Sequence, residues 1–258
     1  MTVVPKKRLG QHFLVDENIL GVIGRLARLR AEDVVLEVGA GLGVLTRYLA
    51  PRVRLVHAVE VDRSLEAPLR AALAGLDNVR LLFADALALD PGTLEPPPGK
   101  LVANLPYNIA TPLLVESLER APTISFWCVM VQREVADRLF APARTKQYGA
   151  VSVLVRLHAR RTGFHVVSPS VFRPRPRVES ALVAFERVAG PPLPLVRPVV
   201  EAAFAHRRKT LANALALAGL ATRAEAEEAL AALGRARDVR AEELEPEELA
   251  ALARALGR

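Results

Sequence analysis

The sequence predicts an α/β protein with a mostly parallel, doubly wound sheet, followed by a small all-α domain. Three observations carry this prediction. Short apolar runs alternate with longer helix-like stretches through most of the chain, and a glycine-rich turn follows the first of these runs. Beyond residue 190 the sequence consists mainly of Ala, Leu, Glu and Arg at helical spacing.

The elements follow in order along the chain. Asp16 is suited to cap a helix whose apolar face includes Ile19 and Ile23, with Arg25 on the opposite face. The alternating part begins after this helix, because apolar runs bounded by helix-like stretches are typical of parallel strands. Its expected strands are residues 34–38, 55–60, 79–83, 100–105 and 126–131, with further strand-like runs at 151–157 and 181–186.

The division into domains is predicted at a proline-rich break. Residues 190–194 read Gly-Pro-Pro-Leu-Pro and end the strand-like pattern. We therefore expect an α/β domain over residues 1–190 and a helical domain over residues 191–258.

Composition limits the class of protein. The formal charge of +7 and the pI of about 10.1 favour a polyanionic partner such as nucleic acid, although the bias toward Arg, Ala, Leu and Pro is also typical of a GC-rich genome or a thermophilic host. No apolar run is long enough for a membrane span, so we expect a cytoplasmic protein. Cys128 is the single cysteine, which excludes an internal disulfide and a cysteine-based metal site, and we expect no metal.

A nucleoside site is predicted where three strands end. The first strand leads into Gly-Ala-Gly-Leu-Gly at residues 39–43, where Gly39 and Gly41 allow close approach of a ligand. Val44 departs from the dinucleotide fingerprint, so a nucleoside without a pyrophosphate fits better. Glu60 could accept both ribose hydroxyls, and Asp85 could meet an adenine amino group. Alone, Glu60 could be a surface carboxylate and Asp85 a helix cap.

The fourth strand ends in Asn104, Leu105, Pro106 and Tyr107, a pattern suited to chemistry on an amino group. An adenine amino nitrogen is a poor nucleophile because its lone pair is delocalised into the ring. The Asn104 side-chain oxygen and the Leu105 carbonyl could accept its two hydrogens and favour a tetrahedral nitrogen. Pro106 would stiffen this turn, and Tyr107 could stack on the base. Taken alone, such a sequence is also a common turn.

These motifs resemble a known family over almost the whole chain. Residues 37–43, 60–62 and 85–87 resemble the first three motifs of the class I S-adenosylmethionine-dependent methyltransferases. Asn-Leu-Pro-Tyr at 104–107 is typical of the ribosomal RNA adenine dimethyltransferase family, and residues 10–14 and 171–181 are similar to other motifs of that family. This chain has His12 where many members have Asn.

The resemblance implies a Rossmann-like class I methyltransferase fold, with a seven-stranded sheet and a small helical C-terminal domain. It implies S-adenosyl-L-methionine as the methyl donor, and it makes Phe172 the second aromatic wall for the target base. The implied cofactor contacts are His12, Leu14, Gly39, Gly41, Glu60, Asp85 and Asn104. The basic residues that could contact RNA phosphates are Arg173, Arg175, Arg177, Arg207, Arg208 and Lys209, with 206–209 expected to open a helix, and the cluster Lys6-Lys7-Arg8.

The implied reaction is dimethylation of N6 on two adjacent adenosines near the 3′ end of small-subunit (16S) rRNA. The expected partner is this RNA within a partly assembled 30S particle, and we expect the protein to act as a monomer. Two alternatives remain: a resistance methyltransferase acting on large-subunit (23S) rRNA, and a non-catalytic RNA-binding assembly factor on the same fold. A nicotinamide oxidoreductase is disfavoured by Val44.

Overall fold

The computed structural model describes residue 6 and residues 10–257, which form two compact units. The first unit comprises the chain up to Ala136 together with Arg160–Arg187, and the second comprises Asp137–Ala159 and the chain from Val188 onward. The predicted division at residue 190 left residues 137–159 with the first domain. In the structure they group with the C-terminal helices, because the helix that they contribute packs against two of those helices.

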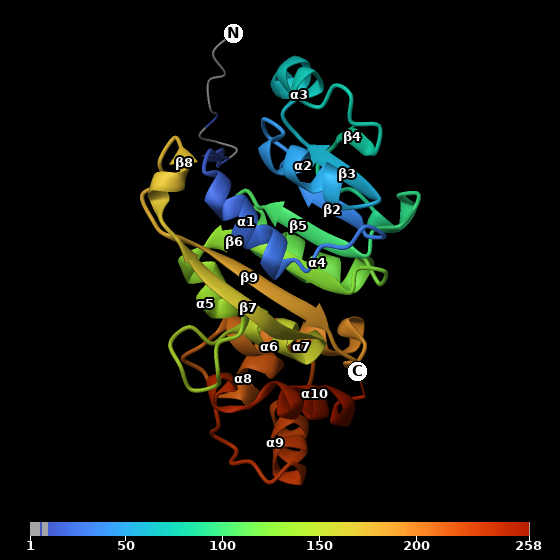
Figure 1. The fold of residues 1–258 in the computed structure, drawn as a ribbon. Helices are drawn as coiled ribbons and strands as arrows, with labels where there is room; N and C mark the ends of the chain where they lie inside the picture. The colour runs from blue at the N-terminus through green and yellow to red at the C-terminus, as the bar shows by residue number, and fades with distance from the viewer. Residues whose placement is uncertain (1–5, 7–9, 258) are drawn as a thin grey trace. The chain divides into compact units, whose positions relative to one another are not determined.

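A seven-stranded sheet is the centre of the first unit (Figure 1). Its strand order is β4-β3-β2-β5-β6-β9-β7, and all pairings from β4 to β6 are parallel, whereas β9 runs antiparallel to β6. The strands are β2 (Val34–Val38), β3 (Leu55–Glu60), β4 (Val79–Phe83), β5 (Lys100–Asn104), β6 (Phe126–Gln132), β7 (Ala159–Val167) and β9 (Ser180–Arg187). This confirms the mostly parallel sheet and the five strands expected between residues 34 and 131.

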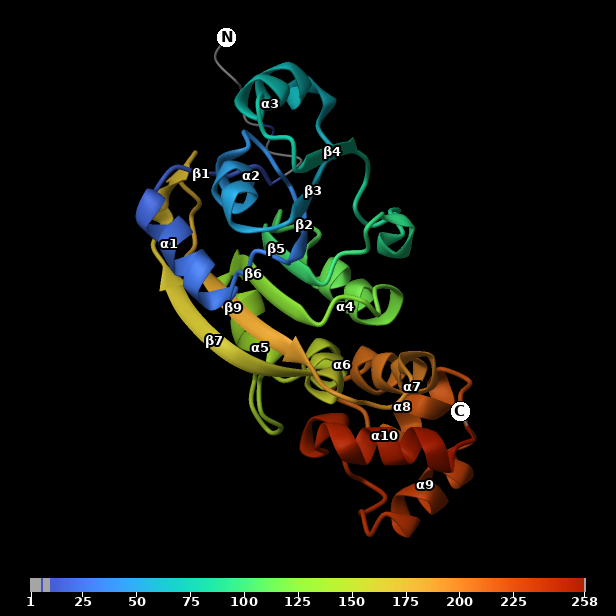
Figure 2. The ribbon, with the colours of Figure 1, turned by 45° about the vertical axis from the view of Figure 1, so that its right-hand side comes forward.

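The sheet is covered on both faces, which explains why its central strands are mainly apolar. Helices α1 (Glu17–Leu26), α2 (Val44–Leu49) and α3 (Glu66–Ala72) cover one face, and α4 (Ala110–Arg120) covers the other (Figure 2). On the α4 face, the Trp127 indole nitrogen donates a hydrogen bond to the Ser117 hydroxyl at 2.9 Å, and both residues are buried. The parallel strands end at one edge of the sheet, so the loops that follow them gather there.

Helix α1 begins as its sequence predicts. The Asp16 side chain accepts hydrogen bonds from the backbone nitrogens of Asn18 and Ile19, at 2.8 and 3.3 Å. Ile19 and Ile23 are buried against the sheet. The chain before α1 forms β1 (Phe13–Leu14), which pairs antiparallel with β8 (Phe172–Arg173) in a separate two-stranded sheet.

The second unit is helical. Its helices are α6 (Ala150–His158), α7 (Leu193–Ala205), α8 (Leu211–Leu217), α9 (Arg223–Ala232) and α10 (Pro246–Ala255), while α5 (Arg133–Leu139) crosses the boundary between the units. The strand expected at 151–157 is therefore wrong. Helix α6 packs against α7 and α10, and residues from Ser152 to Val155 are all buried. A helix that is apolar on most sides has no clear period of 3.6, so its sequence resembles a buried strand.

Short 3-10 turns complete the chain at Ala50–Arg52, Arg63–Leu65, Pro91–Thr93, Pro169–Val171 and Ala241–Glu243. Among the described residues no helix has both the length and the apolar character that crossing a membrane requires.

Candidate methyl-transfer site

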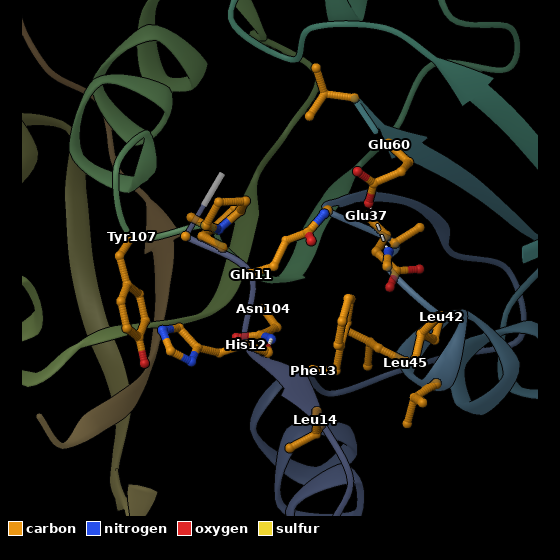
Figure 3. Close-up of a pocket in the computed structure, with 18 residues that line it drawn as sticks. Gln11, His12, Phe13, Leu14, Glu37, Leu42, Leu45, Glu60, Asn104 and Tyr107 are labelled. Carbon is orange, nitrogen blue, oxygen red and sulfur yellow. Dashed lines mark hydrogen bonds between the residues drawn. The ribbon is translucent and has the colours of Figure 1, made fainter. Parts of the chain in front are cut away.

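A cavity lies at the carboxyl ends of β2, β3 and β5 (Figure 3). We call it the inner cavity. Its walls come from the glycine turn after β2, the end of β3, the turn after β5, and the N-terminal strap, defined as residues 10–14. The predicted site residues that line it are His12, Leu14, Gly39, Gly41, Glu60, Asn104, Leu105, Pro106 and Tyr107.

The glycine turn needs its glycines for both conformation and space. Gly39 and Gly41 have φ of +81° and +57°, the left-handed region that side chains rarely adopt. A Cβ on Gly39 would lie 3.2 Å from the Pro106 ring, and one on Gly41 would lie 3.2 Å from the Phe13 ring. The glycine turn therefore fits closely between the strap and the turn of residues 104–107, and its backbone lines the inner cavity.

Glu60 is held in place by the glycine turn and by its own loop. Its Oε2 accepts a hydrogen bond from the Gly41 nitrogen at 2.8 Å, and its Oε1 accepts one from the Asp62 nitrogen at 2.8 Å. Each carboxylate oxygen has two lone pairs, so both can still accept a further bond from a ligand in the inner cavity. The predicted position of Glu60 at the ligand site is thus consistent with the geometry.

Glu37 is a buried carboxyl at the inner cavity to which the sequence analysis gave no role. It lies on β2, only 1% exposed, and its Oε2 has no hydrogen-bond partner among the described residues. Burial raises its pKa from 4.5 to about 8, and the negative charge of Glu60 adds to the rise. A protonated carboxyl of this kind can hydrogen-bond a polar group of a ligand in the inner cavity.

Asp62 fastens the chain before the strap to the loop after β3. It accepts hydrogen bonds from Lys6 Nζ at 2.6 Å, from Gln11 Nε2 at 2.9 Å and from the Ser64 nitrogen at 3.0 Å. Burial alone would raise the pKa of this carboxyl, but these hydrogen bonds outweigh it and hold the pKa well below its usual range. In the sequence, Asp62 is visible only as part of the motif at residues 60–62. Its position two residues after Glu60 is the one signal that indicates a role near the site.

Asn104 is oriented by the strap. Its Nδ2 donates a hydrogen bond to the His12 carbonyl oxygen at 3.1 Å. Because this bond uses the nitrogen side of the amide, Oδ1 remains the acceptor for a ligand. Ser180 holds the tip of the Tyr107 side chain, since the two hydroxyl oxygens lie 2.6 Å apart. Burial raises the pKa of Tyr107.

A second, wider hollow adjoins the inner cavity, and we call it the outer opening. It shares Gly10, Gln11, His12 and Tyr107 with the inner cavity, and it is otherwise lined by Gln132 and residues 174–178. Arg175 and Arg177 are exposed on this wall, as expected for phosphate contacts. Arg173 is exposed but turned back on its own loop, donating to the carbonyl oxygens of Ser170 and Phe172.

Two predicted residues lie away from both hollows. Phe172 has no exposed surface and packs in the core, because its pairing with Leu14 turns its side chain inward. The ring beside Tyr107 is instead that of His12, with 5.4 Å between ring centroids. Asp85 is exposed and accepts a hydrogen bond from the Leu87 nitrogen at 2.9 Å; it stabilises a turn at this position and not the start of a helix, which was the alternative weighed for it.

The basic residues of the second unit form a turn. Residues 206–209 follow α7 and do not open a helix, since Thr210 caps α8 by accepting a bond from the Asn213 nitrogen. Arg207 is paired with Glu242 at 3.2 Å, whereas Arg208 and Lys209 are exposed. Of the N-terminal cluster, Lys6 binds Asp62, and Lys7 and Arg8 lie outside the described residues.

No group of three or more metal-ligating His, Cys, Asp or Glu side chains occurs within residue 6 and residues 10–257. The sole cysteine, Cys128, is buried, and burial raises its pKa to about 12, so it is a core residue.

Comparisons with known proteins identify the family of this chain. The family described as ribosomal RNA adenine dimethylase matches residues 4–254. The Ribosomal RNA small subunit methyltransferase A of Rubrobacter xylanophilus is 50% identical over 97% of this chain and 94% of its own, and that of Kineococcus radiotolerans is 46% identical over 95% and 83%.

Solved structures agree in fold. The 23S rRNA methyltransferase ErmE superposes with a TM-score of 0.67 at 30% identity, covering 95% of this chain and all of its own. A dimethyladenosine transferase from Plasmodium falciparum has a TM-score of 0.80 at 23% identity, covering 93% and 96%. The match over nearly all its length shows that this chain belongs to the ribosomal RNA adenine dimethylase family.

Proposed function

We propose that this protein transfers methyl groups from S-adenosylmethionine to N6 of two adjacent adenosines near the 3′ end of small-subunit rRNA. The product is N6,N6-dimethyladenosine, the protein acts as a cytoplasmic monomer, and its substrate is RNA in a partly assembled 30S particle. One observation carries the proposal: the inner cavity and the outer opening share Tyr107 and residues 10–12, and Asn104 lines the inner cavity close to Tyr107 in the chain. A methyl donor in one and a base in the other would face each other there.

The inner cavity supplies the contacts that the methyl donor needs. When bound, S-adenosylmethionine supplies an electrophilic methyl group on a positively charged sulfur. Glu60 accepts the ribose hydroxyls at the end of β3, and the glycine turn lets the backbone lie close to the ligand. Oε2 of Glu37 faces the same cavity without a hydrogen-bond partner among the described residues, so it is available to a polar group of the ligand.

The base is activated by acceptors that line the inner cavity just before Tyr107 in the chain. Oδ1 of Asn104 and the carbonyl of Leu105 accept the two amino hydrogens, which localises the nitrogen lone pair as it approaches the methyl carbon. Tyr107 packs on the base, which has left its own stack. Alignment of nitrogen, carbon and sulfur supplies most of the rate, and the proton leaves afterward to solvent.

Exposed basic side chains, some at the outer opening and some in the second unit, hold the RNA through its phosphates. Arg175 and Arg177 lie on the wall of the outer opening, and Arg208 and Lys209 are exposed in the second unit. Such contacts bind phosphates without reading sequence, so selection of the target requires a folded RNA surface that presents unpaired adenines. The small subunit is favoured because the curated relatives at 46–50% identity are named for it.

The test compares three substrates. The protein and labelled S-adenosylmethionine are incubated with unmethylated small subunits, unmethylated large subunits, and a short single strand carrying the target sequence. We expect label in the small-subunit RNA alone. Preferential labelling of large subunits would instead support the 23S alternative, and binding without labelling of any substrate would support an assembly factor that has no methyltransferase activity.

A further inference from the structure

Ser180 has a buried hydroxyl at the first residue of β9. The residue has no exposed surface, and it lies on the same face of the strand as Leu182, which belongs to the apolar core. A hydroxyl in such surroundings requires a hydrogen-bond partner. The structure supplies the phenol of Tyr107, whose oxygen lies 2.6 Å from the Ser180 oxygen. The bond therefore ties the tip of the Tyr107 ring to the central sheet.

Strand β6 is the common support for this bond and for the turn that carries the amino-hydrogen acceptors. The Leu105 nitrogen donates a hydrogen bond to the Met130 carbonyl oxygen at 3.0 Å. Ser180 lies opposite Gln132 in the antiparallel pairing of β9 with β6, two residues farther along the same strand. The Tyr107 ring and the Leu105 backbone are therefore both positioned by the end of β6.

The two methyl transfers place different demands on these groups. In each transfer the nitrogen lone pair forms a bond to the methyl carbon, the bond from that carbon to sulfur breaks to leave a neutral thioether, and one N–H proton is lost to solvent. The unmodified amino group offers two hydrogens to Asn104 and Leu105, but the once-methylated group offers only one. Stacking on Tyr107 must then supply a larger share of the alignment. Phe172 is buried in the core and cannot contribute to it.

We propose that Ser180 is a positioning residue for the second methyl transfer: its hydroxyl fixes the orientation of the Tyr107 ring that aligns a once-methylated adenine. This inference rests on the proposed function and deepens it. Loss of the hydroxyl should slow the second transfer more than the first, so that once-methylated adenine accumulates.

Variants of both partners separate this bond from general packing. Ser180→Ala and Tyr107→Phe each remove the hydrogen bond, and the second of them changes nothing inside the core. The double variant tests whether Ser180 acts through Tyr107 alone. Ser180→Thr keeps a hydroxyl on a residue type that suits a strand. Ser117→Ala is the matched control, because it removes another buried serine hydroxyl that binds an aromatic side chain, that of Trp127 on the α4 face.

The methylation assay uses unmethylated small subunits, excess protein and saturating S-adenosylmethionine. Mass spectrometry of RNA fragments over time gives separate rate constants for the first and second transfers. We expect the second to slow about fivefold in Ser180→Ala, in Tyr107→Phe and in the double variant, the factor for one neutral hydrogen bond, and the first by less than about twofold. The ratio of the two rate constants should stay near that of the wild type in Ser180→Thr and Ser117→Ala.

A second measurement needs no RNA. The chain has three tyrosines, so ¹³C-labelled tyrosine gives a simple NMR spectrum, in which the Tyr107 signals are those lost in Tyr107→Phe. We expect the Tyr107 ring to flip faster in Ser180→Ala and to return to the wild-type rate in Ser180→Thr. Tyr48 and Tyr148 serve as internal references.

Three results would overturn the proposal: equal slowing of both transfers in Ser180→Ala, an unchanged Tyr107 ring in that variant, or a double variant much slower than either single one. If the wild type dimethylates large subunits alone, the proposed function fails, and the two rate constants measured on that RNA still decide the role of Ser180. A wild type that methylates neither subunit would overturn both proposals.

Discussion

Replacing Glu37 by glutamine should change how the stability of the first unit depends on pH. Glu37 is buried beside Glu60, and no described residue donates a hydrogen bond to its Oε2. The folded protein therefore favours the protonated carboxyl, with a pKa raised from 4.5 to about 8 mainly by burial. Glutamine has the same size and cannot ionise, so Glu37→Gln removes this titration alone.

The sign and size follow from proton linkage. The unfolded chain releases the Glu37 proton near pH 4.5, whereas the folded protein keeps it until about pH 8. The contribution of Glu37 to stability is thus fully present below pH 4.5 and is lost as pH rises through this window. The loss is about 1.4 kcal/mol per pH unit and about 5 kcal/mol over the whole window. Between pH 6 and pH 8, the unfolding free energy of Glu37→Gln should rise relative to wild type by about 2 kcal/mol, because the folded carboxyl is half ionised at the upper end.

Trp127 makes the assay specific for the first unit. It is the single tryptophan, lies on β6 and is fully buried, so its fluorescence reports unfolding of the sheet. Urea unfolding of both proteins at several pH values gives the two free energies, and groups that titrate in both proteins cancel in the difference. Parallel pH profiles for the two proteins would refute the reasoning, because they would mean that Glu37 is already ionised in the folded state.

Three further changes test other parts of the site. Asn104→Ala removes an amino-hydrogen acceptor, so methyl transfer should fall about a hundredfold or more while cofactor affinity by calorimetry changes far less; near-normal turnover would contradict its role. Glu60→Ala should weaken S-adenosylmethionine binding by about 1.5–3 kcal/mol, and NADH should bind neither protein; tight NADH binding would mean that the cofactor assignment is wrong. Replacing exposed Arg208 and Lys209 with alanine should reduce the slope of log RNA affinity against log salt by about one to two, whereas an unaltered slope would mean that they face solvent in the complex.

Much of the fold could be predicted because the parallel strands are continuous apolar runs. The strands expected at 34–38 and 55–60 agree with β2 and β3 to the residue, since turns with glycine or charged residues bound them sharply. The same reasoning, that a short apolar run is a strand, was wrong for residues 151–157. There an apolar run forms α6, and only its packing among other helices distinguishes it from a strand.

The site was predictable where the backbone fixes the geometry. Glu60 and Asn104 end their strands, Gly39 and Gly41 lie in the turn after β2, and all four line the inner cavity at the same edge of the sheet.

Contacts between distant segments could not be read in this way. Phe172 turns inward because of its register with Leu14, and His12 lies beside Tyr107 because the strap crosses between the two hollows. Such placements depend on long-range pairing, which the order of residues alone does not specify.

The central claim is the identity and position of the product. The most direct measurement maps modified nucleotides in small-subunit RNA from particles treated with the protein and S-adenosylmethionine, by mass spectrometry of RNA fragments. We expect N6,N6-dimethyladenosine at two adjacent positions near the 3′ end, and none when Asn104→Ala is used. Monomethylated adenine alone, or methylation confined to large-subunit RNA in a parallel reaction, would contradict the account.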